Sequence, residues 1–142
     1  MTLKPANLKG FSDMGLTHIA VTVKKNSSEE QASYTATFLV DTGAMDSMIP
    51  ASELHRVGIK PVGIHAYELA NGEHIEYQYG VAEMSFLGEV IGINVVFGPE
   101  NTEPILGVIA LESAGFLVDP KNQRLRKIGA RPLKRVELKS VA

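Results

Sequence analysis

The sequence predicts a mainly β domain with one or two short helices, and three observations support that prediction. Isoleucine, valine and threonine recur in short runs, which is typical of strands. Thirteen glycines and seven prolines supply turns between the runs. The pair Asn71-Gly72 lies between two such runs and tolerates positive φ angles, which indicates a hairpin. A chain of 142 residues is long enough to form one domain around one core.

The expected strands are short apolar runs bounded by turn residues. They cover residues 17–24, 32–40, 47–50, two arms of a hairpin within 64–86, 89–98, 116–120 and 123–128. One or two helical turns are expected at 51–58, with Ser52 as the N-cap and Gly58 as the stop. A second short helix is expected from about Val108 to Ala114, ended by Gly115.

Three segments are expected along the chain. Residues 1–16 read as an N-terminal arm, 17–129 as the folded domain and 130–142 as a basic C-terminal tail.

From Asp119 onward there are eight Lys or Arg against two acidic residues, so this part carries +6 and the remainder −8. Such a run of charge is usually a solvated strand face and tail. The more specific alternative is a surface that binds nucleic acid or an acidic partner. No aromatic residue interleaves these cations, so the stacking platform of single-strand binders is missing.

Several classes of protein are disfavoured by composition. There is no cysteine, so disulfides, thiolate catalysis and zinc–thiolate sites are excluded. The four histidines lack the spacing of a metal site, and no phosphate-binding glycine loop is present, so we expect no metal and no cofactor. No apolar run resembles a signal peptide or a membrane span, and the net charge is only −2. We therefore expect a cytoplasmic protein without a membrane partner.

Asp41 is the residue that calls for explanation. It ends an apolar run and is followed by Thr42-Gly43-Ala44. A buried, unpaired carboxylate costs several kcal/mol, so its place after a core strand needs a reason. The tripeptide could be only a turn, in which Asp accepts backbone N–H bonds and Gly supplies unusual dihedrals. Its setting is more specific, because "PILG" at 104–107 repeats an apolar-apolar-Gly pattern before the second helix.

Five segments together carry a resemblance to a known family. They are "LVDTGA" (39–44), "MIP" (48–50), the hairpin "YELANGEHIEY" (67–77), "PILG" (104–107) and "ALESAGFLVDP" (110–120). This combination resembles the retropepsin-like aspartic peptidases, the single-lobe relatives of pepsin, and is most similar to their bacterial members. The resemblance covers roughly residues 17–128. It implies a closed β-barrel with one or two short helices.

The resemblance implies a catalytic role for Asp41, Thr42 and Gly43. Metal-free peptide hydrolysis needs an activated water and a proton donor, and two adjacent carboxylates that share one proton supply both. The chain carries one such motif, so the second carboxylate has to come from a second copy. The expected enzyme is a homodimeric aspartic endopeptidase with one Asp41 from each subunit. Thr42 would link the two loops, and Gly43 would leave room for close approach.

The resemblance also implies substrate-binding positions. They are Ala44 and Asp46 beside the catalytic loop, Ala70, Asn71 and Gly72 at the tip of a flap, and Ile105, Leu106 and Gly107 in the downstream segment. Asp46 could equally be a solvated turn residue. Viral relatives carry Asp and Arg where this chain has Met45 and Val108, so an apolar contact would replace their ion-pair network. Ala44 lacks the hydroxyl common in pepsin-like lobes, which favours activity at roughly pH 5–7.

Two other functions stay open from the sequence. A domain with the same fold but no dimer would have a single carboxylate and could act only as a peptide- or protein-binding module. A nucleic-acid-binding β-barrel that uses the basic C-terminal stretch is the least favoured function, and it would need binding with a steep salt dependence.

Overall fold

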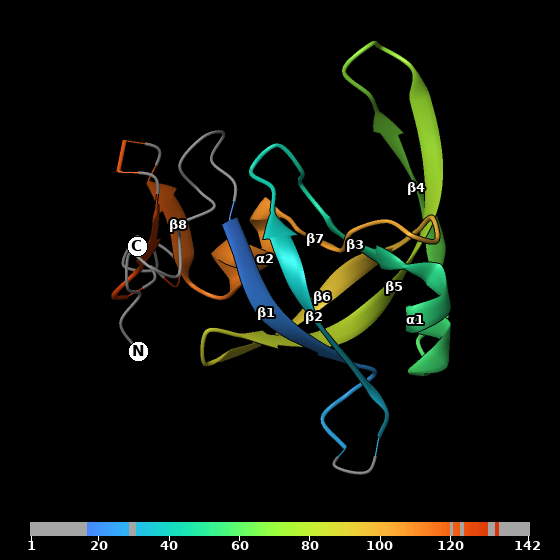
Figure 1. Cartoon of the computed structure of the whole chain (residues 1–142), viewed down its shortest axis with the longest axis horizontal. Helices are drawn as coiled ribbons and strands as arrows, with labels where there is room; N and C mark the ends of the chain where they lie inside the picture. The colour runs from blue at the N-terminus through green and yellow to red at the C-terminus, as the bar shows by residue number, and fades with distance from the viewer. Residues whose placement is uncertain (1–16, 29–30, 120, 123, 131–132, 134–142) are drawn as a thin grey trace, which may run out of the picture.

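Strands make up most of the described chain, as the alternating apolar runs predict (Figure 1). The computed structural model describes residues 17–28, 31–119, 121–122, 124–130 and 133. The predicted arm and nearly all of the predicted tail lie outside these residues. The strands are β1 (Thr17–Lys24), β2 (Ser33–Val40), β3 (Ser47–Pro50), β4 (Gly63–Glu68), β5 (His74–Phe86), β6 (Glu89–Gly98), β7 (Ile105–Leu106), β8 (Phe116–Asp119) and β9 (Arg124–Lys127). The helices are α1 (Ala51–Arg56) and α2 (Val108–Ser113).

Seven strands form one sheet in the order β1-β2-β7-β3-β6-β5-β4. An additional pairing joins β1 to β5, so six strands form a ring that is compatible with the expected barrel. Among the described strands, β4 pairs with β5 alone and lies at the edge of the sheet. The β4–β5 hairpin extends away from the ring at the upper right of Figure 1. The prediction of a mainly β domain with two short helices is confirmed.

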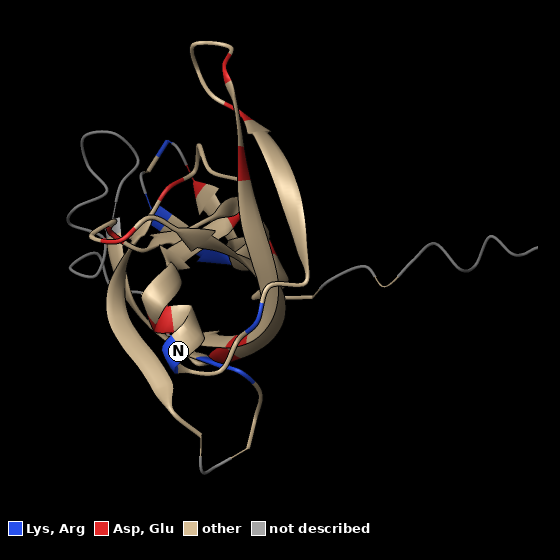
Figure 2. Cartoon of the chain, turned by 90° about the vertical axis from the view of Figure 1, so that its right-hand side faces the viewer, with Lys and Arg blue, Asp and Glu red and all other residues tan. Residues whose placement is uncertain are grey.

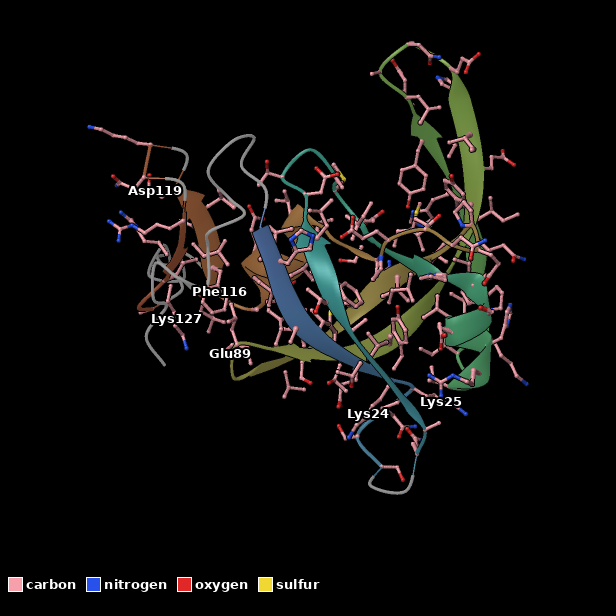
Figure 3. The ribbon with its side chains drawn as sticks, in the orientation of Figure 1. Lys24, Lys25, Glu89, Phe116, Asp119 and Lys127 are labelled. Atoms are coloured by element: carbon pink, nitrogen blue, oxygen red, sulfur yellow. The ribbon has the colours of Figure 1, made fainter. Side chains whose placement is uncertain are left out.

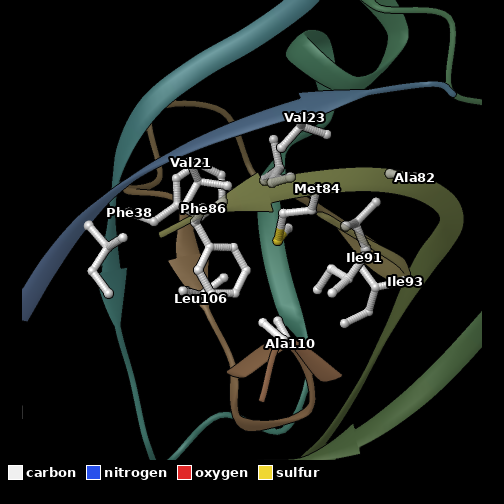
Figure 4. Close-up of a cluster of buried hydrophobic side chains, with 14 of the residues drawn as sticks. Val21, Val23, Phe38, Ala82, Met84, Phe86, Ile91, Ile93, Leu106 and Ala110 are labelled. Carbon is white, nitrogen blue, oxygen red and sulfur yellow. The ribbon is translucent and has the colours of Figure 1, made fainter. Parts of the chain in front are cut away.

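The core consists of aliphatic side chains and a few phenylalanines. The strands place these side chains on one face because they alternate apolar and polar residues. In β1, for example, Ile19, Val21 and Val23 are buried, whereas the residues between them are partly or fully exposed. These side chains meet Phe38 of β2 and other buried residues inside the ring (Figure 4). Each helix adds to the core by one face, and Leu54 of α1 is fully buried.

The start of α1 differs from the prediction. Pro50 occupies the N-cap position, and no side chain caps the helix there. The prediction that Ser52 is the N-cap is wrong, because Ser52 lies within the first turn and faces a distant carboxylate. Its N–H and its hydroxyl both donate to Glu100, at 2.9 and 2.5 Å. The predicted stop at Gly58 is confirmed by its φ of 88° and its N–H bond to the His55 carbonyl.

The two hairpins appear where the sequence predicts them. Between β4 and β5 the Gly72 N–H donates to the Leu69 carbonyl, and Gly72 has a φ of 88°. Asn71 does not have a positive φ. Its side-chain oxygen accepts a hydrogen bond from the Glu73 N–H, which stabilises the turn. Strands β8 and β9 form a separate two-stranded sheet.

The β8–β9 sheet is attached to the ring by its side chains. Lys127 of β9 forms a 2.7 Å ion pair with Glu89 of β6 and lies over the Phe116 ring at 5.8 Å (Figure 3). Among the described residues, no helix is long and apolar enough to cross a lipid bilayer.

Candidate active site

Asp41 directly follows β2, and the parallel pairing of β2 with β7 fixes its position. Leu39 pairs with Ile105 and Val40 with Leu106. The Asp41 N–H continues this pairing and donates to the Leu106 carbonyl at 3.1 Å. The two segments that the sequence singled out, residues 39–44 and 104–107, therefore lie side by side.

The residues after Asp41 form a tight turn around its carboxylate. Oδ1 of Asp41 accepts the Gly43 N–H at 2.9 Å, and its carbonyl accepts the Ala44 N–H at 3.1 Å. The Asp41 side chain is partly exposed, and Thr42 and Gly43 are exposed. The carboxylate thus keeps contact with solvent while the backbone beneath it is fixed.

A second set of hydrogen bonds holds the loop against the start of α2. The first N–H groups of α2, on Val108 and Ile109, donate to the carbonyls of Ala44 and Met45 at 2.9 and 3.1 Å. The start of this short helix therefore uses its unpaired donors to hold the loop. The loop is consequently fixed by β7 at its beginning and by α2 near its end.

Gly107 lies at the closest approach between the two segments. Its N–H donates to the buried hydroxyl of Ser47 at 3.0 Å. A Cβ atom at Gly107 would come within 2.7 Å of the carbonyl oxygens of both Met45 and Asp46. Only glycine allows this packing, because real Cβ atoms essentially never approach backbone atoms so closely.

A groove of about 560 Å³ opens beside this loop. Its floor and one side come from Gly43, Ala44, Met45 and Asp46 of the loop together with Met48, Val96 and Ile105. The other side comes from the β4–β5 hairpin, with His65, Ala66, Tyr67, Glu68, Leu69, Ile75 and Tyr77. The groove is mainly apolar, with Asp46 and Glu68 as its acidic members.

Some of the residues predicted for the site line this groove and others do not. Gly43, Ala44, Asp46 and Ile105 line it. Asp41 lies next to these residues in the loop, and Thr42 lines a separate hollow of about 210 Å³ with residues of α2 and β8. Leu106 and Gly107 are buried beneath the loop. Ala70, Asn71 and Gly72 are exposed at the hairpin tip and do not line the groove.

One side of the groove is aromatic, and its residues were not among those predicted from the sequence. His65 and Tyr67 point inward from β4, and Tyr77 is the register partner of His65 on β5. The Tyr67 and Tyr77 rings lie 6.2 Å apart. Period-2 alternation in "IHAYE" and "HIEYQY" places these rings on one face, so the signal was present.

Tyr67 makes a direct bond to the loop. Its hydroxyl donates to Oδ2 of Asp46 at 2.6 Å. Burial is the main reason that the pKa of Tyr67 lies well above its ordinary value, and the bond to the Asp46 carboxylate and its charge act in the same direction.

Charge around the groove is negative. The hairpin carries Glu68, Glu73 and Glu76, and residues 61–78 contain no Lys or Arg (Figure 2). Among the described residues, no group of three His, Asp or Glu side chains lies close enough to hold a metal ion.

Comparison with known proteins gives the class of this chain. A family model described as aspartyl protease matches residues 19–110 of the 142, which include the Asp41 loop, the hairpin and the 104–107 segment. The chain therefore belongs to the aspartyl protease family, and the family prediction from the sequence is confirmed.

A solved structure is also similar to this chain. The crystal structure of a retropepsin-like aspartic protease from Rickettsia conorii is 19% identical, with a TM-score of 0.44 over 72% of this chain and 77% of that chain. No curated protein matches the sequence significantly.

Proposed function

We propose that the protein is a homodimeric aspartic endopeptidase, in which two Asp41 carboxylates, one from each subunit, activate a water molecule. The observation that carries the proposal is the fixed Asp41 loop beside the groove. Asp41 is held through its N–H by β7, and its partly exposed carboxylate is oriented by the Gly43 N–H. Membership of the aspartyl protease family supports the same chemistry.

A second copy is needed because one carboxylate cannot both activate water and donate a proton. Asp46, another carboxylate of the same loop, is already bonded to Tyr67. A two-fold axis would bring each Asp41 opposite its own copy. Two exposed apolar side chains flank the loop and support such an interface. Met45 is 67% exposed and Ile109 is 39% exposed, and their backbones are joined by a hydrogen bond.

The proposed reaction follows from the shared proton. Two carboxylates about 3 Å apart cannot both ionise, so the pair holds one proton. The ionised carboxylate takes a proton from water, whose oxygen attacks the scissile carbonyl carbon, while the protonated carboxylate donates to that carbonyl oxygen. In the collapse of the tetrahedral intermediate, the carboxyl that took the water's proton gives it to the amide nitrogen, the other carboxylate takes a proton back from a hydroxyl of the intermediate, the carbonyl reforms and the C–N bond breaks. Because the two groups are coupled, their titration belongs to the pair.

The substrate is proposed to be an extended peptide held in the groove. Ala44, Asp46 and Ile105 line the groove and would contact the peptide, together with Gly43. Ala70, Asn71 and Gly72 would reach the peptide only when the hairpin closes, as a flap does. Leu106 and Gly107 would act by supporting the loop, and Thr42 by linking the two loops across the axis.

The test combines the mass in solution with peptide cleavage. We expect a concentration-dependent dimer by analytical ultracentrifugation and cleavage of a mixed peptide library. Asp41→Asn should abolish cleavage and leave the dimer intact. Asp119→Asn is the matched control, because it makes the same change at the end of β8, outside the groove, and it should still cleave. An active Asp41→Asn variant would refute the mechanism.

The alternative is a peptide-binding module without catalysis. It is favoured by the presence of a fully formed groove on a single subunit that carries one Asp41. A strictly monomeric protein that binds library peptides without turnover would establish this function in place of the peptidase.

A further inference from the structure

We propose that Tyr67 is a positioning residue, which holds the β4–β5 hairpin against the Asp41 loop through its hydrogen bond to Asp46 and thereby sets how tightly a peptide is bound. The part of this inference that concerns peptide binding rests on the proposed function. The part that concerns the hairpin rests on geometry alone.

The hairpin has little other attachment. Strand β4 pairs only with β5, and the pairing of β5 with β6 begins at Tyr79. Residues 64–78 thus extend beyond the ring, and among the described strands they have only each other as sheet partners. Within the part of the chain that the structure describes, the bond from Tyr67 to Asp46 is the hydrogen bond that links this segment to the rest of the molecule. An edge hairpin of this kind is a low-stability element unless something anchors it.

The acceptor, by contrast, lies on a fixed part of the fold. The Asp46 carbonyl packs against Gly107 so closely that a Cβ there would lie at 2.7 Å. The next residue, Ser47, is fully buried in β3 and bonded to the Gly107 N–H. The bond therefore joins a donor element with few attachments to an acceptor held by several contacts, and its main effect is to restrain the hairpin.

The Tyr67 ring has support that does not depend on its hydroxyl. It lies 6.2 Å from the ring of Tyr77 and 6.2 Å from that of His65. Removal of the hydroxyl alone should leave the ring in place. The phenylalanine variant therefore isolates the hydrogen bond from the packing.

The bond spans the groove between its two sides. Asp46 and Tyr67 both line it, one from the loop and one from the hairpin. A hairpin that is already held close to the loop loses less freedom when a peptide binds, so binding is tighter. The raised pKa of Tyr67, caused first by burial and then by the bond to Asp46, agrees with a partly dehydrated hydrogen bond.

The test measures the hairpin and the peptide separately. In Tyr67→Phe, amide hydrogen exchange of residues 64–77 should become about tenfold faster, as expected for the loss of a hydrogen bond to a charged group. The KM for the best library peptide should rise by a similar factor, while kcat changes less than about twofold. Asp46→Ala should show the same faster exchange.

Two variants separate the hydrogen bond from a general loss of stability. Asp46→Asn keeps a side-chain oxygen that can accept from Tyr67 but removes the charge, so hairpin exchange should lie between that of wild type and that of Asp46→Ala. Tyr34→Phe removes a tyrosine hydroxyl from β2, away from the groove, and should leave hairpin exchange unchanged.

The outcomes distinguish this inference from the proposed peptidase. Unchanged hairpin exchange in Tyr67→Phe would overturn the positioning role, whatever the activity. Faster exchange with an unchanged KM would overturn the link to peptide binding. If wild type does not cleave, the same comparison is made with the Kd of a bound library peptide, and a weaker Kd in Tyr67→Phe supports the positioning role although the peptidase has failed.

Discussion

At the scale of single residues, Gly107 shows why the site depends on a glycine outside the Asp-Thr-Gly tripeptide. It lies against the carbonyls of Met45 and Asp46 and donates its N–H to Ser47. The sequence pattern "PILG" pointed to this position, but the reason for the glycine is the backbone approach from a distant segment. That reason is visible only in the folded chain.

Gly107→Ala should destabilise the protein and displace the loop. The new Cβ would stand 2.7 Å from backbone atoms that cannot rotate away, so we expect a loss of about 1–3 kcal/mol in the free energy of unfolding. Urea denaturation measures the loss. Gly92→Ala is the control, because a Cβ there meets nothing within 4 Å, and it should change stability little. Equal stability of the two variants would contradict the packing argument.

Ser52 shows where reasoning from local sequence fails. A serine just before a helical pattern is a good N-cap candidate by propensity. The actual partner of Ser52 is Glu100, which lies in the segment after β6. The Tyr67–Asp46 hydrogen bond could not be predicted for the same reason, because no local sequence pattern shows which carboxylate a tyrosine hydroxyl will bond in the folded chain.

At the scale of elements, the strands were predictable because their pattern is local. Alternation of apolar and polar residues places β1, β2, β6 and both hairpins within a residue or two of their true bounds. The same alternation could have identified the aromatic side of the groove, since His65, Tyr67 and Tyr77 recur on one face. What alternation cannot supply is the pairing of β2 with β7, because that depends on how the ring closes.

The start of α1 should respond to acid through Glu100. The Ser52 hydroxyl, and then the Ser52 N–H, lower the pKa of Glu100 below its usual value of 4.5. A lowered folded-state pKa gives stability that is present above pH 4.5 and is lost as the pH falls through the lower folded value. Glu100→Gln should therefore have a lower Tm than wild type at pH 7, and the difference should shrink as the pH falls below 4.5.

Thermal denaturation at several pH values checks this expectation. Glu76→Gln, on the exposed face of β5, is the control and should show a smaller difference at pH 7. A Glu100→Gln difference that does not change with pH would exclude the ionised Glu100 as its cause.

At the scale of the whole molecule, the ring and the groove belong to one subunit, whereas the proposed chemistry needs two. The exposed apolar side chains of Met45 and Ile109 lie beside the loop. Burial of such side chains between copies would stabilise a dimer by about 25 cal/mol for each Å² of apolar surface removed from water.

A charge at this surface should therefore separate the subunits. We expect Met45→Asp combined with Ile109→Asp to shift the sedimentation coefficient to that of a monomer and to reduce cleavage at least tenfold at equal chain concentration. Val90→Asp introduces a charge at another exposed apolar position and should leave the dimer unchanged. A dimeric double variant would place the interface elsewhere on the molecule.

The pairing of β2 with β7 has a consequence for synthesis of the chain. The Asp41 turn is made early, but its supports at Leu106, Val108 and Ile109 are made much later. A nascent chain on the ribosome therefore carries the Asp-Thr-Gly residues without the contacts that shape them until the segment from Leu106 to Ile109 has been made. A product truncated before β7 would contain Asp41 without the contacts that hold its turn in place.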